Sequence, residues 1–195
     1  MKVLGIDLAG SPKRRTGICI MNENFRIIHV SSVFEDSEII EAAKKFKPNL
    51  VAIDAPLSLP KGRESLDKKS NIHFRKCDKE LWKLKIRFFP ITLGPMRSLT
   101  KRGIRLKKVL KNLGFRVIEV YPGATQDILG IPRKQKGREK LLNALKKRGI
   151  KGMKGNENVD ELDAITAAYT GILYLKGKAI EIGDPKEGTI VIPKP

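Results

Sequence analysis

Three short apolar runs in this chain each carry an acidic residue at the carboxyl end. The acids are Asp7, Asp54 and Glu119. Unbroken apolar runs of this length are typical of buried strands, and a predicted helix before the second run favours a parallel pairing with the first. Parallel strands end at one edge of a sheet, where open α/β folds bind ligands. The pattern therefore predicts an α/β fold with a carboxylate site at that edge.

The rest of the chain supports one mixed sheet in a single domain over residues 1–195. Periodicity predicts strands at 3–7, 17–22, 25–33, 50–54 and 115–120, and helices at 37–46, 98–113, about 137–148 and about 159–175. Short extended pieces around Ile180 and Ile190 finish the chain. Residues 57–97 have no clear periodicity, and we interpret them as a basic insertion with helical pieces.

A further acidic site lies at the start of the last predicted helix. Asp160 and Asp163 are three residues apart and therefore project from nearly the same side. Their row continues through small residues, which would let the helix lie close to the sheet: Ala164, Ala167, Ala168 and Gly171. This placement would bring both acids to the strand ends.

Ordinary helix electrostatics also explains part of this pattern. Acids in a first turn favour the helix dipole, and Asn158 with Glu161 resembles a capping box. These effects account for Asp160 and Glu161 but poorly for Asp163, which adjoins the inward stripe of small residues. Each acid alone is more often structural, whereas the four acidic positions together favour a site.

Converging carboxylates repel one another, and divalent cations would relieve that repulsion. Oxygen ligands of this kind suit Mg²⁺ or Mn²⁺. Two ions about 4 Å apart can activate water and stabilise the leaving oxygen of a phosphodiester. The candidate catalytic residues are Asp7, Asp54, Glu119, Asp160 and Asp163.

Positive charge is concentrated in two segments. Residues 61–111 hold 17 Lys and Arg against 4 Asp and Glu, and residues 133–154 hold 10 against 1, within a net charge of +19. Such segments favour a polyanion, and nucleic acid fits better than a membrane because neither segment is a clean amphipathic helix. The candidate nucleic-acid contacts are Lys13, Arg14, Arg15, Arg63, Arg75, Arg97, Lys134, Lys136 and Arg138.

The chain shows no apolar run near the roughly 20 residues of a membrane span and no signal-peptide pattern. Cys19 and Cys77 lack metal-like spacing and favour a reducing compartment. We therefore expect a cytoplasmic protein without a membrane partner, and its Lys-, Glu- and Ile-rich composition is typical of thermophiles. The oligomeric state stays open between a monomer and a homodimer.

Several motifs together resemble the ribonuclease H-like superfamily, closest in style to RuvC-type resolvases. The order is Gly5-Ile6-Asp7, Thr16-Gly17, Ile53-Asp54 and Asp160-x-x-Asp163-Ala164. More specifically, Ile53-Asp54-Ala55-Pro56, Arg75-x-Cys77-Asp78, Glu119-Val120-Tyr121-Pro122 and the Asp-x-x-Asp-Ala motif resemble an uncharacterised family of predicted nucleases of that fold (domain of unknown function 429).

This resemblance, which covers about Gly5 to Ala168, implies a ribonuclease H-like fold. It implies a five-stranded mixed sheet in the order 3-2-1-4-5, with helices on both faces and the basic insertion after the fourth strand. It also implies metal-dependent phosphodiester cleavage in DNA or RNA. The implied metal ligands are Asp7, Asp54, Asp160 and Asp163.

Two other hypotheses remain open. The first is a non-catalytic nucleic-acid-binding protein on the same scaffold. The second is an ATP-binding relative with an actin-like fold, because such folds also place an Asp and a glycine turn after the first strand. Their nucleotide is clamped between two domains, for which 195 residues leave little room.

Overall fold

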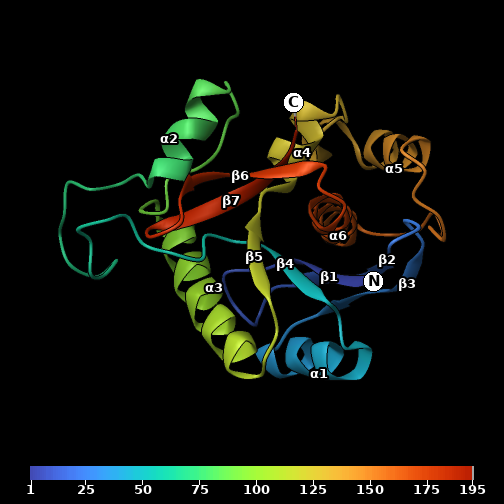
Figure 1. Cartoon of the computed structure of the whole chain (residues 1–195), viewed down its shortest axis with the longest axis horizontal. Coiled ribbons are helices and arrows are strands. Elements are labelled where there is room, and N and C mark those ends of the chain that lie inside the picture. Colours follow the sequence, from blue (N-terminus) through green and yellow to red (C-terminus); the bar gives the residue numbers. More distant parts are fainter. Residues whose placement is uncertain (195) are drawn as a thin grey trace.

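The computed structural model describes residues 1–194. Within them, seven strands form one mixed sheet in the order β3-β2-β1-β4-β5-β7-β6 (Figure 1). The strands are β1 (Lys2–Asp7), β2 (Thr16–Asn22), β3 (Ile27–Val33), β4 (Leu50–Asp54), β5 (Val117–Val120), β6 (Ala179–Asp184) and β7 (Gly188–Pro193). Strand β4 pairs in parallel with β1 and with β5, so the carboxyl ends of these three strands meet at one edge.

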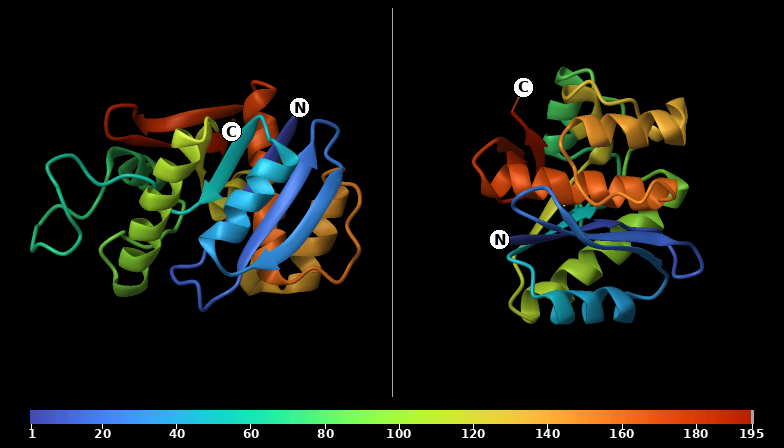
Figure 2. Two further views of the ribbon diagram at one scale, coloured as in Figure 1. Left: turned by 90° about the horizontal axis from the view of Figure 1, so that it is seen from below. Right: turned by 90° about the vertical axis from the view of Figure 1, so that its right-hand side faces the viewer.

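Helices cover both faces of the sheet, as predicted. Helices α1 (Asp36–Phe46) and α3 (Gly94–Asn112) lie on one face, and α6 (Val159–Leu175) lies on the other (Figures 1 and 2). Helices α4 (Pro122–Ile128) and α5 (Arg138–Lys147) lie beyond α6. Successive residues of β1 alternate between the two cores, because Val3 packs with the α6 cluster and Leu4 packs with the α1 and α3 cluster.

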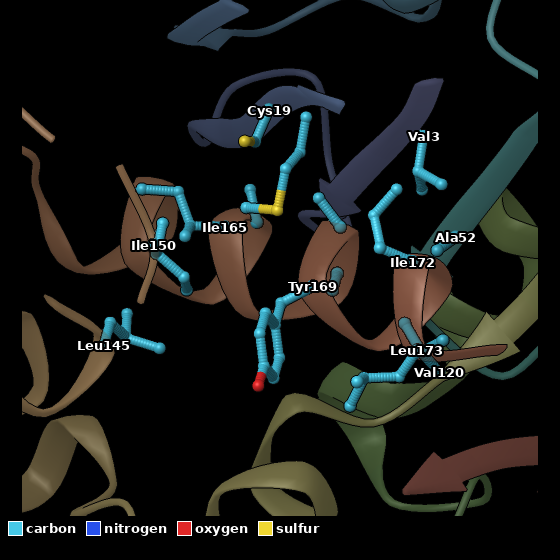
Figure 3. Close-up of a cluster of buried hydrophobic side chains, with 14 of the residues drawn as sticks. Val3, Cys19, Ala52, Val120, Leu145, Ile150, Ile165, Tyr169, Ile172 and Leu173 are labelled. Carbon is cyan, nitrogen blue, oxygen red and sulfur yellow. The ribbon is translucent and has the colours of Figure 1, made fainter. Parts of the chain in front are cut away.

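Helix α6 lies unusually close to β1 and β2. A Cβ atom added at Gly5 would stand 2.3 Å from the backbone oxygen of Ala164, and one at Gly17 would stand 2.1 Å from that of Asp160. Glycines on the strands therefore complement the small residues that the sequence pattern identified on the helix. Figure 3 shows α6 between Val3 and Cys19 of the sheet and Leu145 of α5.

The prediction of a five-stranded sheet was wrong. The first five strands of the observed order are those predicted, and β7 extends the sheet beside β5 with β6 at its edge. The extended pieces around Ile180 and Ile190 are thus a hairpin that joins the sheet. Their strand character was visible in the sequence, but their pairing with β5 depends on a contact between distant segments.

Two helices also differ from their predicted bounds. Helix α3 begins at Gly94 instead of 98, because Pro95 occupies its first turn, where a missing N–H is tolerated. Helix α4 was expected as a loop, since its Pro and Gly residues read as a turn after β5. Among the described residues, no helix combines the length and apolar character needed to cross a membrane.

The basic insertion packs against the added hairpin. It carries α2 (Lys76–Lys83), whose Cys77 and Leu81 share a buried cluster with Ile182, Ile190 and Ile192. The backbone N–H of Gly183 also donates to Glu80 at 3.0 Å. These contacts hold the insertion beside the carboxyl ends of β4 and β5.

Candidate metal centre

The parallel pairing of β1 with β4 places two of the predicted acids side by side. Asp7 and Asp54 are register partners at the ends of their strands, and Asp163 approaches from the first turns of α6. The Asp7 and Asp163 side chains are 15% and 6% exposed. The structure therefore brings together three acids from segments far apart in the sequence.

Lys134 lies among these acids. Its ammonium nitrogen Nζ is 2.7 Å from Oδ2 of Asp163 and 3.9 Å from Oδ2 of Asp7. Lys134 belongs to the short 3-10 helix η1 (Lys134–Lys136), between α4 and α5. Sequence reasoning identified it as a nucleic-acid contact, and no local pattern indicated that its ammonium would reach the acidic cluster.

Gln126 is a second member of the site that the sequence did not indicate. Its amide nitrogen Nε2 donates to Oδ1 of Asp163 at 2.8 Å, and the residue is buried. Gln126 lies on α4, which was expected as a loop. A helical prediction over 122–128 could have placed it on the helix face toward α6.

The protonation equilibria of the acids reflect burial and mutual repulsion. Burial, with the charge of Asp163 second, raises the pKa of Asp7 to about 7. Burial also raises the pKa of Asp54, and the charges of Asp7 and Asp163 add to the rise. Burial alone would lower the pKa of Lys134, but the surrounding Asp7 and Asp163 reverse the shift and hold it above its usual range.

The donor atoms suit a hard divalent cation, although the described side chains do not yet surround a position for one. Carboxylate oxygens are the ligands that Mg²⁺ and Mn²⁺ prefer, and a bound cation would offset the burial and the mutual repulsion that raise the pKa values of Asp7 and Asp54. Among the described residues, however, no three His, Cys, Asp or Glu side chains surround a single point as a metal would require. Lys134 would have to leave the cluster for Asp7 and Asp163 to share an ion.

Asp160 lies at the rim of the cluster. Its side chain is 26% exposed, and one of its oxygens is 3.7 Å from Nε of Arg15 in the β1–β2 loop. Its backbone N–H donates to Oδ1 of Asn158. The Glu161 N–H donates to the same oxygen and the Asn158 N–H donates to Glu161, which confirms the predicted capping box. Ser32 donates to Glu161 at 3.0 Å and thereby ties the start of α6 to β3.

Glu119 lies on a different face of the sheet from the other acids, although it lines the same pocket and its charge adds to the rise that burial causes in the pKa of Asp54. The register pairs Glu119 with Ile53 and Val120 with Asp54, so the alternation of a strand directs Glu119 to the face opposite Asp54. There both of its oxygens accept from the guanidinium of Arg75 at 2.7 Å, and one also accepts from the backbone N–H of Leu57. This bonding gives Glu119 a structural role, and its predicted catalytic role stays a prediction.

Two of the predicted nucleic-acid contacts are in the interior. Arg75 is 2% exposed and also bonds Asp78, while Arg63 is 7% exposed and donates to backbone oxygens of the insertion. Both guanidinium groups are engaged in hydrogen bonds within the protein, and Arg75 also lines the pocket beside the acids. Arg138 is partly buried and donates to the backbone oxygen of Glu157. The remaining candidates beside Lys134 are exposed: Lys13, Arg14, Arg15, Arg97 and Lys136.

A pocket of about 270 Å³ opens beside the acids. Asp54, Asp163 and Lys134 form one side of it. The rest of the lining comes largely from the insertion and from β5 and the residues that follow it. It is mostly apolar, but it includes the ion-paired Arg75, Asp78 and Glu119. Its lining residues there include Leu81, Phe88, Phe89, Ile91, Met96, Leu99 and Tyr121.

The comparisons with known proteins identify a family and a fold. A family model described as "Protein of unknown function (DUF429)" matches residues 5–188. A comparison with curated protein sequences finds no match. The fold of the chain is similar to that of RuvC from Thermus thermophilus, seen both in complex with a Holliday junction substrate and alone.

The likeness to RuvC extends over most of both chains. The junction complex gives a TM-score of 0.58 at 17% identity, and the structure of RuvC alone gives 0.54 at 16%. In each case the alignment covers 91% of this chain and 97% of RuvC. At this level of identity, the likeness shows that the chain has a RuvC-like fold and no more than the fold.

Proposed function

This chain belongs to the DUF429 family of proteins of unknown function, and we propose that it is a metal-dependent nuclease that hydrolyses phosphodiester bonds in DNA or RNA. The observation that carries the proposal is the convergence of Asp7, Asp54 and Asp163 at the carboxyl edge of the sheet. Burying like charges close together costs free energy, and bound cations would offset that cost.

The acids have distinct places in this proposal. Asp7, Asp54 and Asp163 would hold the cations, with Asp160 at the rim as the fourth ligand. Two bound Mg²⁺ or Mn²⁺ ions would supply an activated water and stabilise the leaving oxygen. Gln126 orients Asp163 through its hydrogen bond, and Lys134 balances the charge of the acids in the arrangement described.

The surroundings of the acids suit a nucleic-acid backbone. Lys13, Arg14 and Arg15 extend from the β1–β2 loop at the same edge of the sheet, and Lys136 follows Lys134 on η1. Exposed cations beside the site would hold the phosphates on either side of the bond to be cleaved. The fold likeness to RuvC, whose substrate is a Holliday junction, agrees with this partner.

Titration of Mn²⁺ with a cleavage screen tests the proposal. We expect wild type to bind Mn²⁺ and to cleave at least one of branched DNA, duplex DNA and structured RNA. The double variant Asp7→Asn/Asp163→Asn should lose both properties. Glu64→Gln/Asp67→Asn is the matched control, because it removes the same charge from exposed positions in the insertion. Equal Mn²⁺ binding by all three proteins would contradict the proposal.

A non-catalytic nucleic-acid binder is the second candidate. It is favoured by the position of Lys134, whose ammonium already bonds Asp163 and lies near Asp7. If Lys134 stays in place, the acids form a structural cluster together with it, and nucleic-acid binding by the surface charge is the function. Salt-sensitive binding of nucleic acid without Mn²⁺ binding would support this candidate.

A further inference from the structure

The pocket beside the acidic cluster has an apolar wall that phosphodiester hydrolysis does not require. Phe88 and Phe89 come from the insertion, and Tyr121 follows β5. The same pocket is lined by Asp54 and Asp163 of the acidic cluster. One continuous cavity therefore joins an aromatic surface to the place proposed for the reacting phosphate.

Phe88 of this wall is held in position by other aromatic rings. The ring of Phe88 lies 5.6 Å from that of Trp82 and 6.3 Å from that of Phe74, and the rings of Phe74 and Trp82 lie 4.3 Å apart. Phe89 is 68% exposed although it lines the pocket. The exposed phenyl ring of Phe89 follows the supported ring of Phe88 directly in the chain and offers a surface for a flat apolar ligand.

The segment that carries Trp82 and Phe88 is also rich in exposed cations. Lys79, Lys83, Lys85 and Arg87 are exposed, and the guanidinium of Arg133 lies 5.5 Å from the ring centre of Tyr121. Aromatic rings combined with Lys and Arg are the features by which proteins bind unpaired bases, since the rings stack on bases and the cations hold phosphates. The exposed amide of Gln135, which also lines the pocket, can donate and accept at a base edge.

We propose that this pocket holds one unpaired nucleobase of the strand whose phosphodiester lies at the acidic cluster. The inference rests on the proposed nuclease function for the position of the phosphate. A base and its phosphate are joined by a single sugar, so one nucleotide can occupy both ends of the cavity. The volume of about 270 Å³ is slightly below that of typical drug-sized pockets, roughly 300–1,000 Å³, and excludes a double helix.

A pocket for one unpaired base restricts the class of nucleic acid that can bind. A base inside a continuous duplex is stacked and paired, and its removal from the stack costs free energy. A base in a single strand, a bulge or a branch point enters the pocket at a smaller cost. The preferred substrate is therefore a nucleic acid with at least one unpaired nucleotide at the cleavage position.

Binding without metal tests the pocket separately from cleavage. In EDTA, we would compare a duplex carrying one bulged 2-aminopurine with the same duplex fully paired, using anisotropy for affinity and 2-aminopurine emission for stacking. We expect wild type to bind the bulged duplex about 10-fold more tightly and to quench its emission, in line with the strength of base stacking on aromatic side chains.

Two variants then test whether the preference for the bulged duplex and the quenching depend on Phe89. Phe89→Ala should lose the preference for the bulge and the quenching, with unchanged binding of the paired duplex and unchanged salt dependence. The control Leu84→Ala removes an exposed apolar side chain of the same segment that does not line the pocket, and should behave as wild type. Equal binding of both duplexes by wild type, or equal weakening of both by Phe89→Ala, would overturn the proposal.

The outcomes distinguish this proposal from the proposed function. Bulge preference and quenching without cleavage in Mn²⁺ would support the base pocket and contradict the nuclease. Mn²⁺-dependent cleavage that is equal for bulged and paired duplexes, with no quenching, would support the nuclease and overturn the base pocket.

Discussion

At the residue scale, the negatively charged forms of Asp7 and Asp54 are disfavoured in the folded protein. They are adjacent in the parallel register, and burial is the largest cause of the raised pKa of each. The folded protein therefore binds protons at these positions more tightly than the unfolded chain does. Its stability must fall as those protons are lost.

The first prediction concerns the pH dependence of stability. The pKa of Asp7 is 3.8 unfolded and about 7 folded, so its contribution to stability is fully present below pH 4 and is lost as pH rises through 7. Asp7→Asn should remove this loss and raise the free energy of unfolding at pH 8 by about 1–4 kcal/mol.

Thermal unfolding measured at pH 5 and pH 8 checks this prediction. The gain in Tm should be larger at pH 8 than at pH 5. Asp67→Asn, at an exposed position, is the control and should leave Tm nearly unchanged. A lower Tm for Asp7→Asn at pH 8 would mean that the charged carboxylate stabilises the fold.

The second prediction concerns the buried ion pairs of Arg75. Arg75→Met leaves Glu119 and Asp78 without their cationic partner in the interior. Breaking a buried pair in this way costs about 3–5 kcal/mol, whereas a surface change costs about 0.5 kcal/mol or less. Denaturant unfolding should show the large loss for Arg75→Met and almost none for the exposed Arg87→Met. Similar losses of unfolding free energy for the two variants would contradict the structural role assigned to Arg75.

At the scale of elements, the contact between α6 and the sheet determines whether the acids meet. Asp163 is brought toward Asp7 and Asp54 because α6 lies directly on β1 and β2, where Gly5 and Gly17 leave room for its backbone. A helix one side chain further away would separate Asp163 from the strand ends.

The third prediction tests that contact. The new Cβ of Gly5→Ala would lie 2.3 Å from the Ala164 oxygen, so α6 must shift away from the sheet. Overpacking of a core costs about 1–3 kcal/mol, and contact with backbone atoms places this variant at the upper end or beyond. Gly94→Ala, where no atom lies within 4 Å, is the matched control.

Chemical denaturation and Mn²⁺ titration together check the outcome. Gly5→Ala should lose stability and should also weaken Mn²⁺ binding in the fraction that remains folded, because Asp163 moves with the helix. Retention of both properties at the level of Gly94→Ala would show that α6 adapts without moving the acids.

At the scale of the whole molecule, the net charge of +19 is distributed unevenly. The fourth prediction is that cations beside the site contribute more to nucleic-acid binding than cations on α1. Lys13→Ala/Arg14→Ala should reduce the slope of log K against log salt by up to about 2 for duplex DNA. Lys44→Ala/Lys47→Ala removes the same charge near the end of α1, on the face opposite α6, and should change the slope less. Equal slopes for the two variants would mean that nucleic acid does not bind preferentially beside the acidic site.

The local sequence determined the elements that carry the acids. Apolar runs ending at Asp7 and Asp54 form β1 and β4, and Asn158 and Glu161 form the expected cap of α6. The stripe of small residues correctly indicated a helix close to the sheet. These features are readable because periodicity, capping and residue size act within one turn or one strand.

Only the tertiary structure decided which side chains share the site. Glu119 follows the same strand-end pattern as Asp54, yet the register directs it to the other face, where Arg75 binds it. Lys134 and Gln126 join Asp163 from segments with no local signal for such a role. The face of a strand and the partner of a charge depend on pairing between distant segments, and that information is not contained in any one stretch of the chain.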